Sequence, residues 1–358
     1  MKVMVNGATG LVGLSVVDAF MAAGHEVRAS DRPGSNFGEL TKRGLEVVPA
    51  ELSDLEALGQ TVAGMDVVVH VAGLFDLGAS AQLLEQVNHQ GTRNVCEAVL
   101  KHAPNLTRFV QVATVGVYGK PVRCPCKEDD PKRPRNHYEK SKYRGELAAF
   151  EFHDKHGLPV SSIRPTLVYG PRAKYGHAMF IGVMTMIKAG GRPDIWGLKS
   201  GPRSSHVHVE DVGRAALQVA ISEGSVGKAF NVADPNPLDG PTFIRALAEP
   251  VGLEVKEWVP FIKPMMTGIG AIAPLIPLGL LKPVNNYIRK RWARLVEERG
   301  LANELNVRLD RDWIGYTTSD NYYDVTRLKE LGFEWKWPNA VEGLKQTINW
   351  YREHEWIP

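Results

Sequence analysis

The chain has 358 residues, of which 44% are hydrophobic and 23% charged, and a formal charge of +3. This composition is typical of a globular protein, and the small charge argues against a nucleic-acid partner, which usually needs a concentrated basic surface. The three cysteines predict no disulfide framework, and the first residues do not read as a signal peptide, so we expect a cytoplasmic location.

Short β-branched runs alternate with helical patterns along the first half of the chain. Strands are predicted at 2–5, 26–30, 46–49, 66–71, 109–113 and 160–163. A helix with apolar residues at helical spacing follows the first strand from residue 11 and ends at Gly24, and another is predicted at 53–62. This alternation predicts an α/β fold with a Rossmann-type, doubly wound parallel sheet.

A glycine-rich loop stands between the first strand and the first helix. Its sequence is Gly7-Ala8-Thr9-Gly10-Leu11-Val12-Gly13. Small residues there let the backbone approach a pyrophosphate, and the following helix N-terminus presents N–H groups to it. The loop therefore predicts dinucleotide binding.

The residue that ends the second strand bears on the choice of dinucleotide. Asp31 can accept hydrogen bonds from both ribose hydroxyls and repels a 2′-phosphate. Arg32, next to it, could instead pair with a 2′-phosphate. We favour NAD, with NADP as the less favoured alternative, and a polar turn without a cofactor role also remains open.

A tyrosine and a lysine share one face of a predicted helix. Tyr138 and Lys142 are four residues apart, and Thr114 follows the fifth strand, at the sheet edge where ligands bind. Lowering the pKa of a tyrosine from about 10 to about 7 takes about 4 kcal/mol. An ammonium group about 5 Å away supplies about 3 kcal/mol at an effective dielectric constant of about 20. Lys142 and an oxidised nicotinamide could therefore hold Tyr138 partly as phenolate.

These motifs together resemble the extended short-chain dehydrogenase/reductase family. The resemblance rests on the loop at 7–13, Asp31, HVAG at 70–73, Asn88 with Gly91-Thr92, TVGVYG at 114–119, YEKSK at 138–142 and IRPTLVYGP at 163–171. It implies a catalytic triad and further cofactor contacts. The triad is Thr114, Tyr138 and Lys142; the further contacts are Leu52, Ala72, Gly73, Pro165 and Val168. The chain departs from the family where Ala50-Glu51-Leu52 replaces a Gly-Asp-Leu motif, which puts the adenine contact in doubt.

The family contains a nucleotide-sugar branch and a branch resembling 3β-hydroxysteroid and sterol-4-carboxylate 3-dehydrogenases. Sugar enzymes usually carry an arginine that grips the diphosphate. Here Ser204 occupies that position, and Arg203 lies one residue early. His206 and His208 alternate with valines and are interpreted as strand residues, so we expect no metal site. The resemblance further implies a Rossmann domain of residues 1–169 and 206–234 and a smaller α/β substrate lobe of residues 170–205 and 235–358.

Residues 258–302 look like an insertion within the substrate lobe. An apolar stretch inside this insertion has three possible structural roles. Residues 264–281 carry no charge, and the basic cluster at 289–294 follows. The stretch is short for a membrane span and is broken by proline and glycine. Attachment of 264–294 to a membrane surface, or a lid over an apolar pocket, is favoured over a span and over a buried core segment.

The sequence thus predicts an NAD(P)-dependent oxidoreductase acting on the 3β-hydroxyl or 3-keto group of a sterol or a similarly large apolar substrate. If the substrate carries an adjacent carboxylate, the β-keto acid product would lose carbon dioxide. A nucleotide-sugar epimerase or dehydratase is the alternative, and a non-catalytic NAD-binding protein is a third. We expect a cytoplasmic protein at or near the cytoplasmic membrane face, and a homodimer is common in the family.

Overall fold

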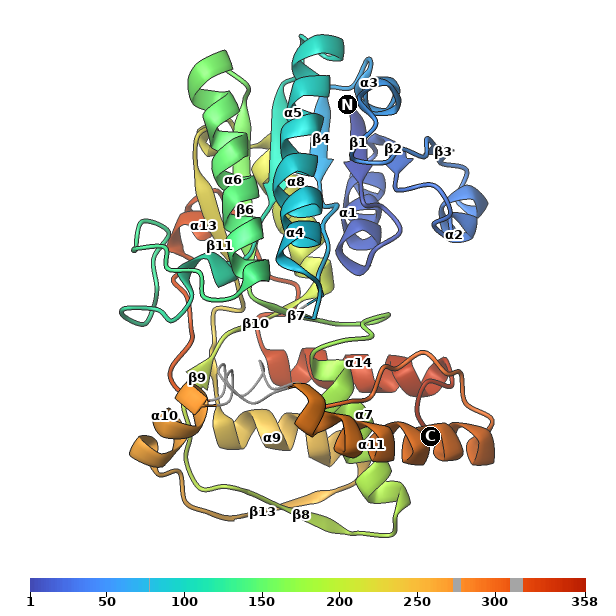
Figure 1. The fold of residues 1–358 in the computed structure, drawn as a ribbon, viewed down its shortest axis with the longest axis vertical. Coiled ribbons are helices and arrows are strands. Elements are labelled where there is room, and N and C mark those ends of the chain that lie inside the picture. Colours follow the sequence, from blue (N-terminus) through green and yellow to red (C-terminus); the bar gives the residue numbers. More distant parts are fainter. Residues whose placement is uncertain (77, 273–277, 310–317) are drawn as a thin grey trace. The chain divides into compact units, whose positions relative to one another are not determined.

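The computed structural model describes residues 1–76, 78–272, 278–309 and 318–358, which divide into two compact units (Figure 1). Unit 1 comprises Met1–Thr166, Val209–Ala233 and Asp324–Lys336, and unit 2 comprises Leu167–His208, Asp234–Tyr323 and Trp337–Pro358. The predicted boundaries placed 324–336 in the substrate lobe and 167–169, 206–208 and 234 in the Rossmann domain; by their contacts, 324–336 belongs to unit 1 and the other three to unit 2. The two units are described separately below.

Unit 1 is built on a parallel sheet of seven strands in the order β11-β6-β5-β4-β1-β2-β3. Its strands are β1 (Lys2–Asn6), β2 (Glu26–Ser30), β3 (Glu46–Val47), β4 (Val67–His70), β5 (Arg108–Val112), β6 (Val160–Pro165) and β11 (Ala229–Val232). The strand order reverses between β1 and β4, which is where doubly wound sheets bind their ligands. The predicted fold class is confirmed.

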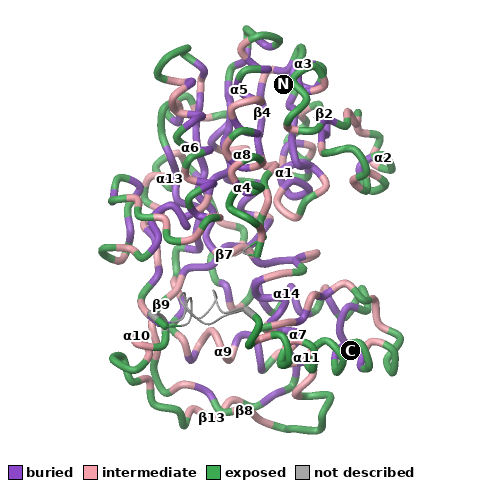
Figure 2. The backbone as a smooth tube through the Cα atoms, in the orientation of Figure 1, coloured by how far each residue is buried: buried purple, intermediate pink, exposed green. Residues whose placement is uncertain are grey.

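Helices cover both faces of this sheet, as parallel strands require. They are α1 (Leu11–Ala22), α2 (Gly38–Lys42), α3 (Leu55–Val62), α4 (Ala81–Leu84), the π-helix η1 (Glu85–Gln90), α5 (Gly91–His102), the 3₁₀ turn η2 (Val115–Tyr118), α6 (His137–His156), α8 (Val209–Ile221), the 3₁₀ turn η3 (Glu223–Ser225) and α13 (Thr326–Glu330). On one face, α3, α5 and α6 pack a buried apolar cluster against the strands. Elsewhere α1 packs on α8, where a Cβ at Gly213 would lie 2.3 Å from the Ser15 carbonyl oxygen. Figure 2 shows the central strands in the buried part of unit 1 and α2 largely exposed.

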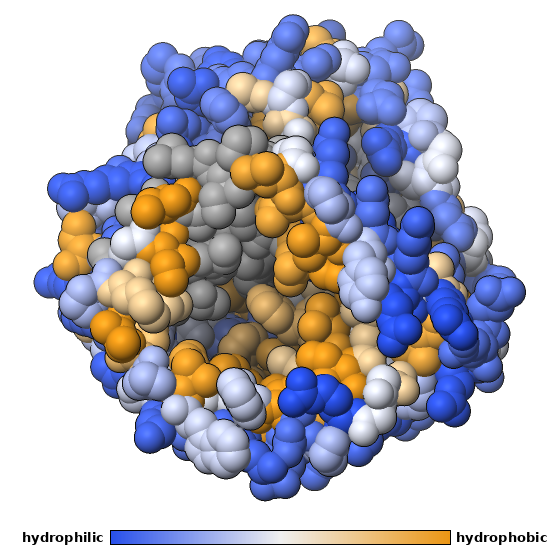
Figure 3. Space-filling view, turned by 60° about the horizontal axis from the view of Figure 1, so that its bottom comes forward, coloured by the Kyte–Doolittle hydropathy of each residue, from blue (hydrophilic) through white to orange (hydrophobic). Residues whose placement is uncertain are grey.

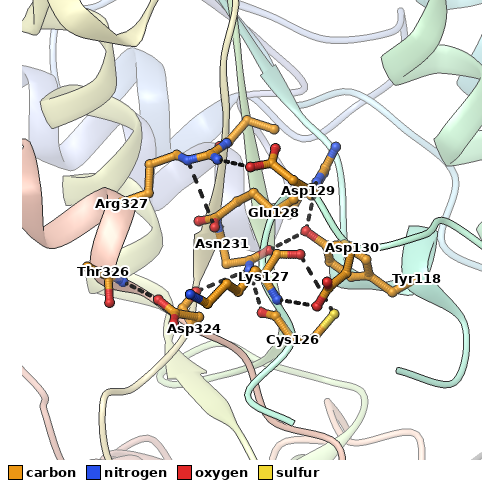
Figure 4. A network of polar contacts seen from close by, with 12 residues as sticks. Tyr118, Cys126, Lys127, Glu128, Asp129, Asp130, Asn231, Asp324, Thr326 and Arg327 are labelled. Atoms are coloured by element: carbon orange, nitrogen blue, oxygen red, sulfur yellow. Dashed lines mark hydrogen bonds and ion pairs between the residues drawn. The ribbon is translucent and has the colours of Figure 1, made fainter. Parts of the chain in front are cut away.

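The late segment 324–336 joins unit 1 through polar contacts (Figure 4). The Asn231 side chain on β11 donates a hydrogen bond to the Asp324 carbonyl oxygen at 3.1 Å, and the Asn231 backbone N–H donates to Glu128 at 3.0 Å. Arg327 donates to the Ala229 carbonyl oxygen at 3.1 Å. These three hydrogen bonds join residues that are 93, 103 and 98 positions apart in the sequence, so no local pattern could place the segment.

Unit 2 has a helical core with three two-stranded sheets. Its elements are β7 (Leu167–Tyr169), α7 (His177–Ala189), β8 (Asp194–Leu198), β9 (Arg203–Ser204), β10 (His206–His208), β12 (Leu238–Asp239), α9 (Gly240–Ala248), the 3₁₀ turn η4 (Glu249–Val251), β13 (Glu254–Val259), α10 (Lys263–Ile272), α11 (Leu278–Arg299) and α14 (Ala340–Glu353). Parallel pairs form between β7 and β10 and between β8 and β13, and β9 pairs antiparallel with β12. The core gathers apolar residues from α7, α9, α11 and α14.

The two histidines predicted on a strand do lie on β10 and are buried. His206 Nδ1 lies 2.8 Å from Nε2 of His177 on α7, and its ring stacks on Phe243 with 4.8 Å between centroids. Burial lowers the pKa of His177 to about 3 and that of His206 well below its ordinary value. Both rings are therefore neutral parts of the unit 2 core.

These neutral histidines predict a loss of stability in acid. The unfolded chain binds their protons near pH 6.5 whereas the folded chain does not, so the free energy of unfolding should fall as the pH drops from 6.5 towards about 3. His177→Gln should make this dependence shallower by up to about 1.4 kcal/mol per pH unit, measured by urea unfolding. The exposed His156 provides the matched variant His156→Gln, and equal slopes for the two variants would contradict the expectation.

Candidate functional site

The glycine loop has the packing expected of a dinucleotide cradle. Gly7 has φ +79°, and a Cβ there would lie 2.6 Å from the Ala72 backbone nitrogen. A Cβ on Gly13 would lie 2.0 Å from the Gly7 carbonyl oxygen. Gly10 is the N-cap of α1, and Leu11 begins the helix. Side chains are therefore excluded at Gly7 and Gly13, which leaves the loop backbone and the N-terminus of α1 available to a pyrophosphate.

Asp31 is held against this loop. Its Oδ2 accepts hydrogen bonds from the Thr9 hydroxyl at 2.6 Å and the Thr9 backbone N–H at 3.1 Å. Its Oδ1 accepts from the Arg32 backbone N–H at 2.8 Å, while the Arg32 residue is exposed. A carboxylate fixed at the end of β2, beside the glycine loop, fits a dinucleotide whose adenosine ribose has free hydroxyl groups, and it would repel one with a 2′-phosphate. The residues present therefore fit NAD.

Other predicted cofactor residues lie at the same sheet edge. Ala72 follows β4 and donates its N–H to the Asn6 carbonyl oxygen at 3.0 Å. Leu52 packs on α5, where a Cβ at Gly91 would lie 2.7 Å from Leu52 Cδ1. Pro165 ends β6 in unit 1. Val12 occupies the first turn of α1.

Val168, a further predicted cofactor residue, follows Pro165 by three residues. It lies on β7 and belongs to unit 2. Its contact with a nicotinamide stays a prediction.

The three predicted catalytic side chains converge within unit 1. Thr114 caps η2, where its hydroxyl accepts a hydrogen bond from the Gly116 N–H at 3.1 Å. The side chains of Thr114 and Tyr138 are hydrogen-bonded to each other. One turn along α6, Lys142 Nζ donates to the carbonyl oxygen of Val112 at 2.7 Å, at the end of β5. The sheet edge and the first turns of α6 thus bring together the hydroxyl groups of Thr114 and Tyr138 and the ammonium group of Lys142, which the Val112 carbonyl oxygen holds in place.

Burial is the main influence on the pKa values of Tyr138 and Lys142 in the protein without a cofactor. Burial raises the pKa of Tyr138, the charge of Glu139 raises it further, and the hydrogen bond with Thr114 lowers it only in part. Burial lowers the pKa of Lys142 to about 8, with a partial rise from the charge of Glu146. Desolvation by burial is the largest cause of both shifts, so in the protein alone Tyr138 is protonated.

Two residues at the site were not assigned to it from the sequence. Asn88, quoted above only for the resemblance, lies in the π-helix η1, an irregularity common at functional sites. Its side chain accepts from the Leu74 N–H at 2.7 Å and donates to Ser141 Oγ at 2.9 Å. A Cβ on Gly73 would lie 3.0 Å from Asn88 Oδ1 and 3.3 Å from Lys142 Nζ. The asparagine thus ties the loop after β4 to α6.

The second missed residue is Phe75. Its ring meets Tyr138 edge to face, with 4.9 Å between centroids, and the residue is exposed. A single aromatic residue in an irregular segment gives no sequence signal of its own.

The apolar stretch 264–281 forms parts of two helices, α10 and α11, and residues 273–277 lie outside the described part. Met265, Ile269, Ile272 and Leu280 are exposed, which disagrees with a buried core segment. Within the described ranges, no helix has both the length and the apolar character to cross a bilayer.

Comparison with known proteins assigns the family. Residues 3–233 match the model of the NAD dependent epimerase/dehydratase family, and the chain belongs to this family. It is 29% identical over 263 residues to dTDP-glucose 4,6-dehydratase of Streptomyces griseus, covering 70% of this chain and 79% of that protein. It is 28% identical over 264 residues to 3-beta-hydroxysteroid dehydrogenase of Mycolicibacterium neoaurum, covering 70% of each.

The fold has close solved counterparts. UDP-glucose 4-epimerase of Thermotoga maritima, solved with UDP-glucose, superposes with a TM-score of 0.71 at 22% identity, covering 99% of both chains. The predicted extended short-chain dehydrogenase/reductase resemblance agrees with the family, and NAD is the cofactor of the family to which the chain belongs. The relatives include both predicted branches and do not single out the steroid branch.

Proposed function

We propose that the protein oxidises a secondary hydroxyl of a nucleotide-linked sugar, as an epimerase or dehydratase. The hydrogen-bonded Thr114–Tyr138 pair, with Lys142 anchored one turn away, carries the oxidation chemistry. The sugar-nucleotide enzymes among the relatives support the substrate class. The proposal ranks a nucleotide-sugar above a sterol as the substrate, which reverses the preference drawn from the sequence.

In this proposal each residue has a distinct task. Thr114 holds the substrate oxygen, and Tyr138 takes the hydroxyl proton. Bound NAD supplies the hydride acceptor. Lys142, fixed on the Val112 carbonyl oxygen, places positive charge near the phenol oxygen and favours its ionised form. Burial raises the pKa of Tyr138 in the protein alone. Removal of the substrate's hydroxyl proton by Tyr138 therefore depends on the positive charges of Lys142 and of bound, oxidised NAD.

One observation keeps the 3β-hydroxysteroid reaction as a second candidate. Ser204 stands at the diphosphate arginine position and contacts His206 Nε2 at 3.0 Å. The neighbouring Arg203 is hydrogen-bonded to the Tyr322 hydroxyl, and its guanidinium lies 4.3 Å from that ring's centroid. The arginine nearest to the expected position is thus already engaged within unit 2, which weakens the argument for diphosphate recognition.

A product assay separates the two candidates. The purified protein with NAD is incubated with dTDP-glucose, UDP-glucose or a 3β-hydroxysterol. We expect conversion of a nucleotide-sugar without net NADH accumulation, because an epimerase or dehydratase returns the hydride to the sugar. Net NADH formation with the sterol alone would instead support the steroid reaction. No conversion of any substrate together with measurable NAD binding would favour a non-catalytic NAD-binding protein.

A further inference from the structure

Helix α10 carries an apolar stripe on its exposed side. Ile262, just before the helix, and Met265, Ile269 and Ile272 follow one another at spacings of three, four and three residues, which places them along one helix face. All four are exposed. An apolar stripe with this period normally packs against the rest of the protein. Here it points into solvent.

Helix α11 continues the same pattern and then becomes basic. Leu280, Val284 and Tyr287 are exposed at spacings of four and three, and Arg291 and Arg294 extend the row. The adjacent row of the helix holds Ile288, Trp292 and Leu295 in the unit 2 core. The helix is therefore fixed by one side, while its neighbouring flank presents apolar and then cationic side chains.

Two exposed tryptophans lie on the paired strands β8 and β13 of the same unit. Trp196 is 66% exposed and Trp258 is 61% exposed. Their ring centroids are 6.2 Å apart, and Lys256 Nζ lies 5.7 Å from the Trp258 centroid. Exposed indoles beside cationic groups are typical of the membrane–water interface, where the ring has an apolar body and a polar edge.

The charge of this region is one-sided. Between Trp258 and Val296 the sequence has six lysines and arginines and no aspartate or glutamate, although the whole chain has a formal charge of only +3. Arg294 pairs with Glu298 at 2.7 Å. No acidic partner of Arg289, Lys290 or Arg291 occurs in the part of the chain that the structure describes. These three cations remain available to anionic groups.

We propose that this surface, formed by the β8–β13 tryptophans, α10 and the exposed flank of α11, binds a membrane containing anionic lipids. Figure 3 shows apolar side chains gathered towards the centre of one face, with hydrophilic side chains around them. Apolar side chains with neighbouring basic groups match an anionic interface. A second copy of the chain is a poorer occupant, because a symmetric interface would bring like charges together.

Vesicle co-sedimentation tests the surface without any substrate, so the result is independent of the proposed reaction. The full-length protein is mixed with vesicles of phosphatidylcholine alone or with a quarter phosphatidylglycerol. We expect sedimentation with the anionic vesicles and its loss at high salt. Equal binding to both vesicle types, or none to either, would overturn the proposal.

Matched variants localise the contact. Ile272→Ser should lower the vesicle partition coefficient about five-fold, whereas Ile221→Ser, at a 50% exposed position on α8, should not change it. Exchanging Arg289, Lys290 and Arg291 together for glutamine should lower the coefficient about 100-fold. The same exchange at the exposed Lys42, Lys101 and Lys228 is the control for net charge.

Two outcomes of the variant series would show that this surface is not a membrane-binding site. Equal losses in the surface and control variants would show binding by net charge alone. A dimer in light scattering that Ile272→Ser dissociates would show that a second copy covers the surface. Either result would overturn the membrane proposal.

Discussion

Replacing Tyr138 with phenylalanine is expected to lower kcat about 1,000-fold, because the change removes the group that takes the substrate proton. The phenyl ring keeps the edge-to-face contact with Phe75, so the local packing should survive. The variant also leaves the glycine loop and Asp31 unchanged. NAD affinity, measured by calorimetry, should therefore stay within about two-fold of the wild type.

The control for this variant lies on the same helix. Tyr143→Phe removes a phenol hydroxyl five residues further along α6, beyond the Tyr138–Lys142 pair. It should retain most of the wild-type kcat. Near-normal turnover by Tyr138→Phe would falsify the assignment of Tyr138 as proton acceptor, whatever the substrate proves to be.

The sheet and its ligand edge could be predicted because their signals are local. A β-branched run followed by the glycine loop and a helical pattern identifies β1 and α1 from a few neighbouring residues. The same applies to Tyr138 and Lys142, whose spacing of four fixes a shared helix face. The third strand is shorter than predicted, Glu46–Val47 instead of 46–49, because it is the edge strand and pairs only with β2.

Features that depend on distant partners could not be predicted in this way. The pairing of β8 with β13 brings Trp196 close to Trp258, although 61 residues separate them. Hydropathy identified 264–281 as apolar but could not tell whether another element covers it. The pKa of Tyr138 depends on how far the fold removes its ring from water, and this desolvation could not be known when the prediction counted only the charges of Lys142 and an oxidised nicotinamide.

The buried ion pair behind the site gives the largest expected effect on stability. Arg164 on β6 donates from Nε and Nη2 to the two carboxylate oxygens of Glu146 on α6, at 2.9 and 3.0 Å. Its Nη1 donates to the Tyr118 hydroxyl at 2.7 Å and to the Glu128 carbonyl oxygen at 3.0 Å. Both charged side chains are buried. The pair therefore fixes α6, one turn beyond Lys142, to the sheet.

Arg164→Met is expected to lower the free energy of unfolding by about 3–5 kcal/mol, because it leaves the Glu146 carboxylate buried without its cation. The matched variant Arg93→Met breaks a half-exposed ion pair with Glu151 and should cost about 0–1 kcal/mol. Adding Glu146→Gln to Arg164→Met removes the stranded charge and should restore part of the loss. Urea unfolding of the four proteins measures these differences. If Arg164→Met and Arg93→Met lost equal stability, burial would not make the Arg164–Glu146 pair more important than the half-exposed Arg93–Glu151 pair. The proposed anchoring of α6 by the buried pair would then be wrong.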